Sequence, residues 1–138
     1  MRVALVYASA GESRAASPIV EALAGALRAR GYQTERIEAK SGEAHRLSGF
    51  DYIIVGTEPV GIRGRLPRQL ADFLAQAGSV QGRRSMAFVR RRGISSAKAL
   101  KRLMSTMETE GMMVNFAMIV AGTDDAVRAA GEAPIERN

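Results

Sequence analysis

The 138-residue sequence lacks cysteine and tryptophan and has a single histidine, His45. Without cysteine the chain has no disulfide, no Cys-ligated iron–sulfur cluster, no thiolate zinc site and no cysteine nucleophile. One histidine rules out a His-rich metal site and makes a Ser–His–Asp triad depend on that residue alone. His45 lies in a polar segment and is expected at the surface. Redox chemistry would therefore have to come from a bound cofactor.

Long hydrophobic runs are also absent, and none approaches the roughly 20 residues of a membrane span. The opening residues, MRVALVYASAGES, have too short an apolar stretch for a signal peptide and lack its charged n-region. With 46% hydrophobic and 25% charged residues, the composition is typical of a soluble globular protein. We expect one domain over residues 1–138, cytoplasmic and without membrane association.

Positive charge, by contrast, is plentiful and concentrated. Of the 20 basic residues 17 are arginine, and the net charge is +6. Residues 63–102 hold eleven basic residues against one acid, Asp72, so this segment carries +10 and the other 98 residues carry −4. The eleven are Arg63, Arg65, Arg68, Arg83, Arg84, Arg90, Arg91, Arg92, Lys98, Lys101 and Arg102. Two interpretations stay open: an anionic partner or ligand on one side of the molecule, or solvated arginines on helix surfaces.

Apolar runs alternate with amphipathic segments along the chain. Short runs rich in β-branched residues predict strands at 2–7, 33–38, 50–57, 86–90 and 114–122. Of these, 33–38 reads as an edge strand and 114–122 as a buried one. Helical spacing predicts four helices, which begin at Ser17-Pro18, at Leu66, at Ser95 or Ser96 acting as a cap, and at Asp124-Asp125.

This alternation implies a parallel sheet with helices on both faces. In such sheets a ligand lies beyond the carboxyl ends of the strands, where the strand order reverses. The loops expected to form a site are therefore 8–16, 57–65 and 90–95.

Across nearly its whole length the sequence resembles the flavodoxin-like family. VYASAGESR looks like the family's phosphate loop, and DYIIVGTEPVGIRGRLPRQLADFL looks like its third strand, flavin-side loop and following helix. The Gly93 loop and DDAVRAAGE are weaker similarities. The resemblance implies an α/β three-layer sandwich with a five-stranded parallel sheet in the order 2-1-3-4-5.

The resemblance also implies an FMN site. Ser9, Gly11 and Ser13 would hold the FMN phosphate, with backbone donors from Ala10 and Glu12. The flavin-side loops would contribute Thr57, Glu58, Pro59, Val60, Gly61, Arg90, Arg91, Arg92 and Gly93. The implied function is electron transfer or small flavin redox chemistry. No catalytic residue set and no metal ligands are identified, and any enzyme activity would be that of an FMN-dependent oxidoreductase.

Departures from the family pattern support an alternative. The spacing from Ser9 to Gly11 is one residue shorter than usual, and Glu12 stands where the family usually has a neutral asparagine. The flavin-side loops carry no aromatic residue; their apolar residues are Val60, Ile62 and Ile94. The alternative is an FMN-free flavodoxin-like module that binds an acidic protein partner or a phosphate-containing ligand through its arginine-rich rim.

Two further possibilities concern partners. Direct nucleic-acid binding would match the positive charge, but the sequence has no aromatic residues interleaved with its basic ones and no known nucleic-acid-binding motif. This hypothesis therefore ranks below the FMN-binding protein and the FMN-free module. Five methionines at core spacing favour a gap-filling role in the core, or alternatively a self-association face and a homodimer. They are Met104, Met107, Met112, Met113 and Met118.

Overall fold

The protein is built on a five-stranded parallel sheet in the order β2-β1-β3-β4-β5. The computed structural model describes residues 1–9, 17–39 and 42–136. The strands are β1 (Arg2–Ala8), β2 (Gln33–Glu38), β3 (Tyr52–Thr57), β4 (Arg84–Arg90) and β5 (Met113–Val120). This confirms the predicted α/β class and strand order.

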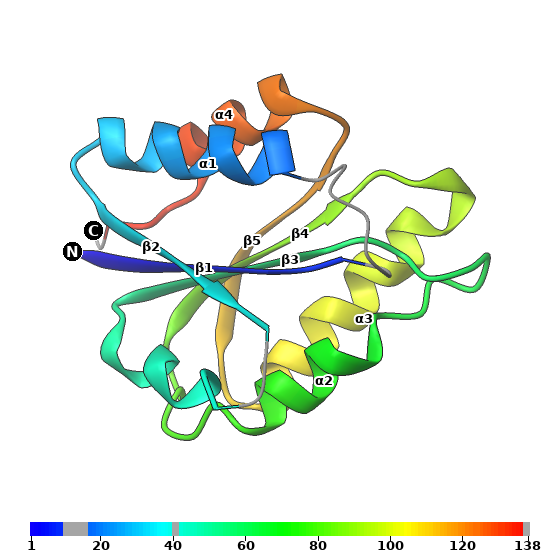
Figure 1. The fold of residues 1–138 in the computed structure, drawn as a ribbon, viewed down its shortest axis with the longest axis horizontal. Coiled ribbons are helices and arrows are strands. Elements are labelled where there is room, and N and C mark those ends of the chain that lie inside the picture. The colour runs from blue at the N-terminus through cyan, green and yellow to red at the C-terminus, as the bar shows by residue number, and fades with distance from the viewer. Residues whose placement is uncertain (10–16, 40–41, 137–138) are drawn as a thin grey trace.

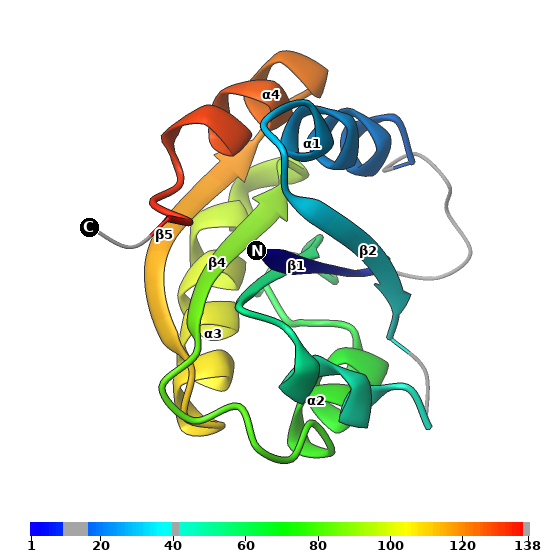
Figure 2. The same ribbon diagram turned by 90° about the vertical axis from the view of Figure 1, so that its left-hand side faces the viewer.

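Helices cover both faces of the sheet, as Figures 1 and 2 show. One face carries α1 (Ser17–Ala29) and α4 (Thr123–Glu132), and the other carries α2 (Arg68–Ala75) and α3 (Ser96–Thr109). Two 3₁₀ turns, η1 (Ala44–Gly49) and η2 (Gly93–Ser95), complete the described elements. No helix in the described part of the chain is long and apolar enough to cross a membrane.

The central strands are apolar because both of their faces are covered. All six residues of β3 are buried, and so are the inner positions of β1 and β4. Two apolar clusters result, one between the sheet and α1/α4 and one between the sheet and α2/α3.

The two ends of α1 are set by a glycine and a proline. Gly31, with a φ of +91°, ends the helix in a conformation that would be strained for a residue with a side chain. Pro18 lies in the first turn of α1, where its missing N–H costs no helix bond.

The edge strands differ from one another and from expectation. As predicted, β2 is an edge strand with only Thr34 and Ile37 buried. The prediction of a buried final strand is wrong, because β5 is the opposite edge of the sheet and only Val120 in it is fully buried. An edge strand has a neighbour on one side alone, so its side chains keep contact with solvent.

The methionines divide between the two roles considered. Met107 and Met112 are buried in the core, while Met104 and Met118 are partly buried against it. Met113 at the start of β5 is 59% exposed. Gap filling is thus confirmed for the first two, and self-association stays a prediction. His45 lies exposed in η1, as expected.

Candidate functional site

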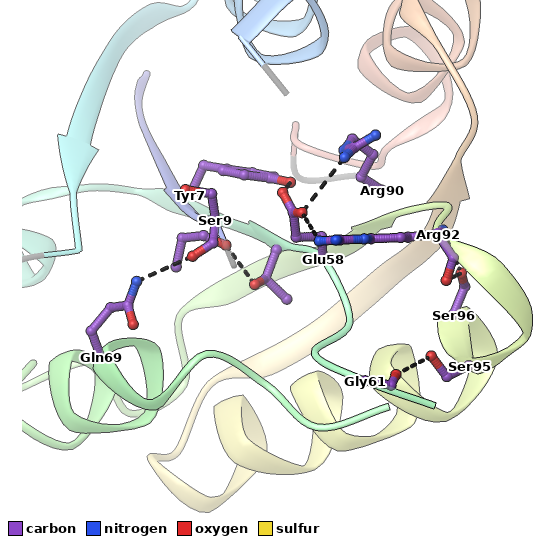
Figure 3. Close-up of polar contacts among 11 residues, drawn as sticks. Tyr7, Ser9, Glu58, Gly61, Gln69, Arg90, Arg92, Ser95 and Ser96 are labelled. Atoms are coloured by element: carbon purple, nitrogen blue, oxygen red, sulfur yellow. Dashed lines mark hydrogen bonds and ion pairs between the residues drawn. The ribbon is translucent and has the colours of Figure 1, made fainter. Parts of the chain in front are cut away.

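At the carboxyl edge of the sheet, three side chains gather around the buried carboxylate of Glu58. The group is here called the Glu58 cluster: Tyr7, Glu58, Arg90 and Arg92 (Figure 3). Glu58 follows β3 and has no exposed surface. Its Oε1 accepts a 3.1 Å hydrogen bond from the Tyr7 hydroxyl, and its Oε2 accepts a 2.9 Å bond from Arg92 Nη1. Arg90 Nη2 lies 3.5 Å from the same Oε2.

Strand register brings these residues together. Tyr7, Gly56 and Phe88 are directly paired across β1, β3 and β4. Since side chains alternate along a strand, Glu58 and Arg90, each two residues further on, continue on the same face. A Cβ at Gly56 would lie 2.1 Å from the Phe88 ring. The glycine thus leaves room for the Tyr7 and Phe88 rings, whose centroids are 5.8 Å apart.

Burial sets the electrostatics of the cluster. A carboxylate removed from water is costly unless it is paired and hydrogen-bonded, and here two guanidinium groups and a phenol supply those partners. Burial, and next the Glu58 charge, raises the pKa of Tyr7 above its ordinary value of 10.0. Tyr7 therefore serves as a neutral donor at physiological pH. With two cations and one anion, the cluster keeps a net charge of +1.

Beyond Glu58 the chain makes a tight turn that packs on the start of α3. The Val60 amide donates a 2.7 Å hydrogen bond to the Arg65 carbonyl, which closes the turn. Gly64 has a φ of +68°, and a Cβ there would lie 2.8 Å from the Ser95 carbonyl and 2.9 Å from the Ala99 amide nitrogen. Only glycine combines this φ with so close an approach of two backbones.

Ser95 connects the two loops at the strand ends. Its hydroxyl donates a 2.9 Å hydrogen bond to the Gly61 carbonyl (Figure 3). Although Ser95 occupies the N-cap position of α3, its side chain makes no capping bond, so that part of the sequence prediction is wrong. Ser96 Oγ instead accepts a 2.9 Å bond from the Arg92 amide, which fixes the 92–96 turn. A distant carbonyl thus takes the Ser95 hydroxyl, while Ser96 makes a local bond to the turn before the helix.

Between these loops and the start of α2 is an open cavity of about 590 Å³. Its walls come from residues 59–62, 67–69 and 92–95. Val60, Ile62 and Ile94 provide an apolar lip, with Ile62 79% and Ile94 92% exposed. Arg68 and Arg92 add positive charge to the lining. The cavity suits a ligand with an apolar body and negative charge.

The predicted flavin-side residues fall into two groups. Pro59, Val60, Gly61, Arg92 and Gly93 line the cavity. Of the others, Thr57 is fully buried and its hydroxyl donates a 2.6 Å bond to the Ala8 carbonyl. Glu58 and Arg90 belong to the Glu58 cluster, and Arg91 is exposed beside it. Their role toward a flavin stays a prediction.

The predicted phosphate loop is described at its first residue alone. Ala10, Gly11, Glu12 and Ser13 lie outside the described residues. Ser9 follows β1, and its carbonyl accepts a 3.2 Å bond from Gln69 Nε2, so this loop begins against α2.

Sequence reasoning did not single out Tyr7, Arg68, Gln69 or Ser95 as site residues. In the sequence pattern Tyr7 is simply the last residue of an apolar strand. The available signal was the hydroxyl of Tyr7 at the carboxyl end of β1. Glu58, the acid that follows β3, lies at the same edge of the sheet. Ser95 ends the 90–95 loop that is expected to form the site, but its bond to Gly61 depends on how η2 packs. Arg68 and Gln69 carry no local signal, because their place in the site depends on how α2 packs.

Comparison with known proteins identifies the architecture. No family model and no curated protein sequence matches the chain. Among solved structures, oxidised flavodoxin 1 from Bacillus cereus matches with a TM-score of 0.79 and 17% identity over 100% of both chains. The two-electron reduced flavodoxin of Megasphaera elsdenii matches with a TM-score of 0.75 and 18% identity, over 95% of this chain and 99% of its own. Oxidised flavodoxin 2 from Bacillus cereus gives 0.74 and 17%, over 94% of this chain and 95% of its own.

At these identities the likeness concerns the fold. Topology, strand order and nearly complete coverage agree with the resemblance drawn from the sequence. The chain has the flavodoxin fold.

Proposed function

We propose that this protein binds FMN in the cavity between the 59–62 and 92–95 turns and acts as a flavin-dependent electron carrier. The supporting observation is the cavity itself, about 590 Å³ at the carboxyl edge of a sheet with the flavodoxin fold. Ligands of open α/β sheets bind at this edge.

The residues present fit a flavin. A flavin ring is flat and largely apolar, and Val60, Ile62 and Ile94 offer it aliphatic contact. Arg68 and Arg92 suit the anionic part of the molecule. Two of the similar structures are of an oxidised and of a two-electron reduced flavodoxin, which also favours a redox role.

When bound, FMN supplies the reversible uptake of one or two electrons. The chain's own residues would exclude water and set the local charge. Ile62 and Ile94 shield the cavity mouth, while the Glu58 cluster holds the Arg92 guanidinium in place. Because this lining is positively charged, we expect it to favour the electron-rich form of a bound flavin and so a higher reduction potential than an acidic rim would give.

FMN titration tests this proposal. The purified protein mixed with FMN should absorb at about 450 nm after gel filtration and quench flavin fluorescence. The double variant Ile62→Ala/Ile94→Ala should weaken binding by about tenfold, the equivalent of two truncated apolar contacts. Val127→Ala on α4, the truncation of an aliphatic residue that is 53% exposed and lies outside the cavity lining, is the control. A colourless protein that binds no added FMN would refute the proposal.

One observation favours the flavin-free alternative. No described residue that lines the cavity is aromatic, so ring stacking is absent from this part of the site. In that case the arginine-rich rim would bind an acidic protein or a phosphate-containing ligand directly. Failure of the FMN titration together with retained binding of inorganic phosphate, lost in Arg68→Gln/Arg92→Gln, would favour this second function.

A further inference from the structure

A second group of cations lies next to the cavity, here called the cationic face. It consists of Arg63, Arg65, Arg91, Lys98, Lys101 and Arg102, all exposed. Within residues 1–9, 17–39 and 42–136, none of the six makes an ion pair or a side-chain hydrogen bond. Of the other described arginines, all but Arg68 donate to a carboxylate or a carbonyl. Unsatisfied charge is therefore concentrated in one region.

Five of the six cations lie on two segments that pack together, the 61–65 turn and α3. Arg65 and Arg102 line the same surface hollow of about 440 Å³, together with Leu66, Ser105 and Thr106. The turn that carries Arg63 and Arg65 packs on the start of α3, because a Cβ at Gly64 would lie 2.8 Å from the Cβ of Lys98. Arg91 is exposed at the end of β4, next in the sequence to the Arg92 that lines the cavity.

The arrangement on α3 costs stability when nothing is bound. Lys98, Lys101 and Arg102 are spaced i, i+3 and i+4 and so project from one side of the helix. Like charges at this spacing repel, and the helix has no acid before Glu108 to offset them. An external anionic surface would remove this repulsion.

Apolar residues adjoin the cations. Ile62 and Ile94 project at the cavity mouth with 79% and 92% of their surface exposed. A small apolar centre with a charged border is the usual composition of a protein–protein interface. Single-stranded nucleic-acid sites, by contrast, stack bases on aromatic rings. None of the seven aromatic residues of this chain is exposed.

From these observations we infer that the cationic face docks an acidic protein, whose carboxylates pair with the six cations while its surface covers Ile62 and Ile94. Such docking closes the cavity mouth and brings the partner's own redox centre next to it. That the partner exchanges electrons there rests on the proposed function, whereas the docking itself needs no flavin. The inferred partner is a small acidic electron-transfer protein.

The probe for this inference is a plant-type [2Fe–2S] ferredoxin with an acidic surface, titrated into ¹⁵N-labelled protein at about 20 mM salt. We expect amide shifts confined to residues 60–65, 91–94 and the first half of α3, and a loss of affinity as salt is raised to about 300 mM. Arg65→Glu/Arg102→Glu should weaken binding by at least about tenfold. The matched control is Arg36→Glu/Arg128→Glu, which makes the same change in net charge on β2 and α4. It should stay within about twofold of wild type.

Three results would overturn the inference: no binding of the ferredoxin at low salt, shifts outside the cationic face, or equal losses in the two double variants. A 20-base-pair DNA duplex is titrated in parallel. Tighter binding of the duplex, lost in Arg65→Glu/Arg102→Glu, would identify the surface as a nucleic-acid site instead. Flavin binding is measured separately by fluorescence quenching, so a protein that docks ferredoxin but binds no FMN refutes the proposed function and leaves the docking inference standing.

Discussion

The Glu58 cluster and the cationic face, two groups of basic residues from one segment of the sequence, differ in the partners of their charges. Arg90 and Arg92 share one buried carboxylate, whereas the cationic face has no carboxylate partner among the described residues. Both groups belong to the same +10 segment of the sequence. The difference teaches that charge content alone does not show which cations have a carboxylate partner within the fold. One acid, placed at the end of β3, makes the difference.

Position in the fold explains why Glu58 selects Arg90 and Arg92. Both arginines leave β4 beside the end of β3, within reach of a carboxylate on the same sheet edge. The cations of α3 and the 61–65 turn are exposed and form no ion pair with Glu58. Removing the shared carboxylate should therefore lower the stability of the protein far more than changing any residue of the cationic face.

The largest effect is expected for Glu58→Gln. This change keeps the shape but leaves Arg90 and Arg92 without their counter-charge, and we expect a loss of about 3 kcal/mol in the free energy of unfolding. Urea denaturation measures it. Glu108→Gln, an exposed acid on α3, is the control and should change stability by less than about 0.5 kcal/mol. Equal losses for Glu58→Gln and Glu108→Gln would contradict a special role of the buried carboxylate in stability.

A smaller loss is expected for Tyr7→Phe, which removes the hydroxyl donor to Glu58 and leaves the ring against Phe88. A hydrogen bond to a charged group contributes about 1.5 kcal/mol. The double variant with Glu58→Gln should lose less than the sum of the two single variants, because they share one interaction. Additive losses would argue against this hydrogen bond.

Alkaline pH should weaken the same cluster. Burial raises the pKa of Tyr7 above 10.0, so the folded state binds its proton more tightly than the unfolded state does. This contribution to stability is complete below pH 10 and is lost as the pH rises further. Burial also raises the pKa of Tyr52, so part of the decline should persist in Tyr7→Phe. Unfolding midpoints between about pH 8.5 and 11.5 test this, and an unchanged slope in Tyr7→Phe would contradict the assignment.

Arg91 and Arg92, neighbours in the sequence, directly test the contrast between a cation paired with Glu58 and one of the cationic face. Arg92→Gln should cost about 1 kcal/mol or less, since its side chain is 54% exposed and solvent screens the pair. Arg91→Gln, next to it but without a partner among the described residues, should leave stability unchanged within about 0.3 kcal/mol. Thermal unfolding measures the stability of both variants. A larger loss for Arg91→Gln than for Arg92→Gln would show that Arg91, and not Arg92, stabilises the fold.

The smallest effect has the opposite sign. Lys98→Glu places an acid in the first turn of α3 and four residues before Arg102, so it should stabilise the protein by about 0.5 kcal/mol. The same change lowers the charge of the cationic face and should weaken ferredoxin binding. Lys98→Gln is the control for lost charge without a new ion pair. A destabilised Lys98→Glu variant would show that Lys98 has a partner within the fold.

The predictable parts of the fold were those encoded in local pattern. Apolar runs located the strands, and helical spacing located α1 and α3 to within a few residues. The apolar run at 114–122 predicts a buried strand, because such a run looks the same in a central strand and in an edge strand with one covered side. The predicted order 2-1-3-4-5 already places this strand at the sheet edge, and that order, not the local pattern, gives the exposure of β5. The sequence predicts Ser95 or Ser96 as a helix cap, yet the Ser95 hydroxyl bonds to Gly61, a partner 34 residues away that no local pattern reveals.

For the candidate site, the sequence by itself determined which loops meet at the carboxyl edge, because parallel strands end on one side of the sheet. It also determined the positive charge of this edge and the absence of cysteine chemistry. Only the tertiary structure decided which charges are satisfied. Ion pairing depends on distances of a few ångströms between side chains far apart in the sequence, and those distances follow from strand register and helix packing.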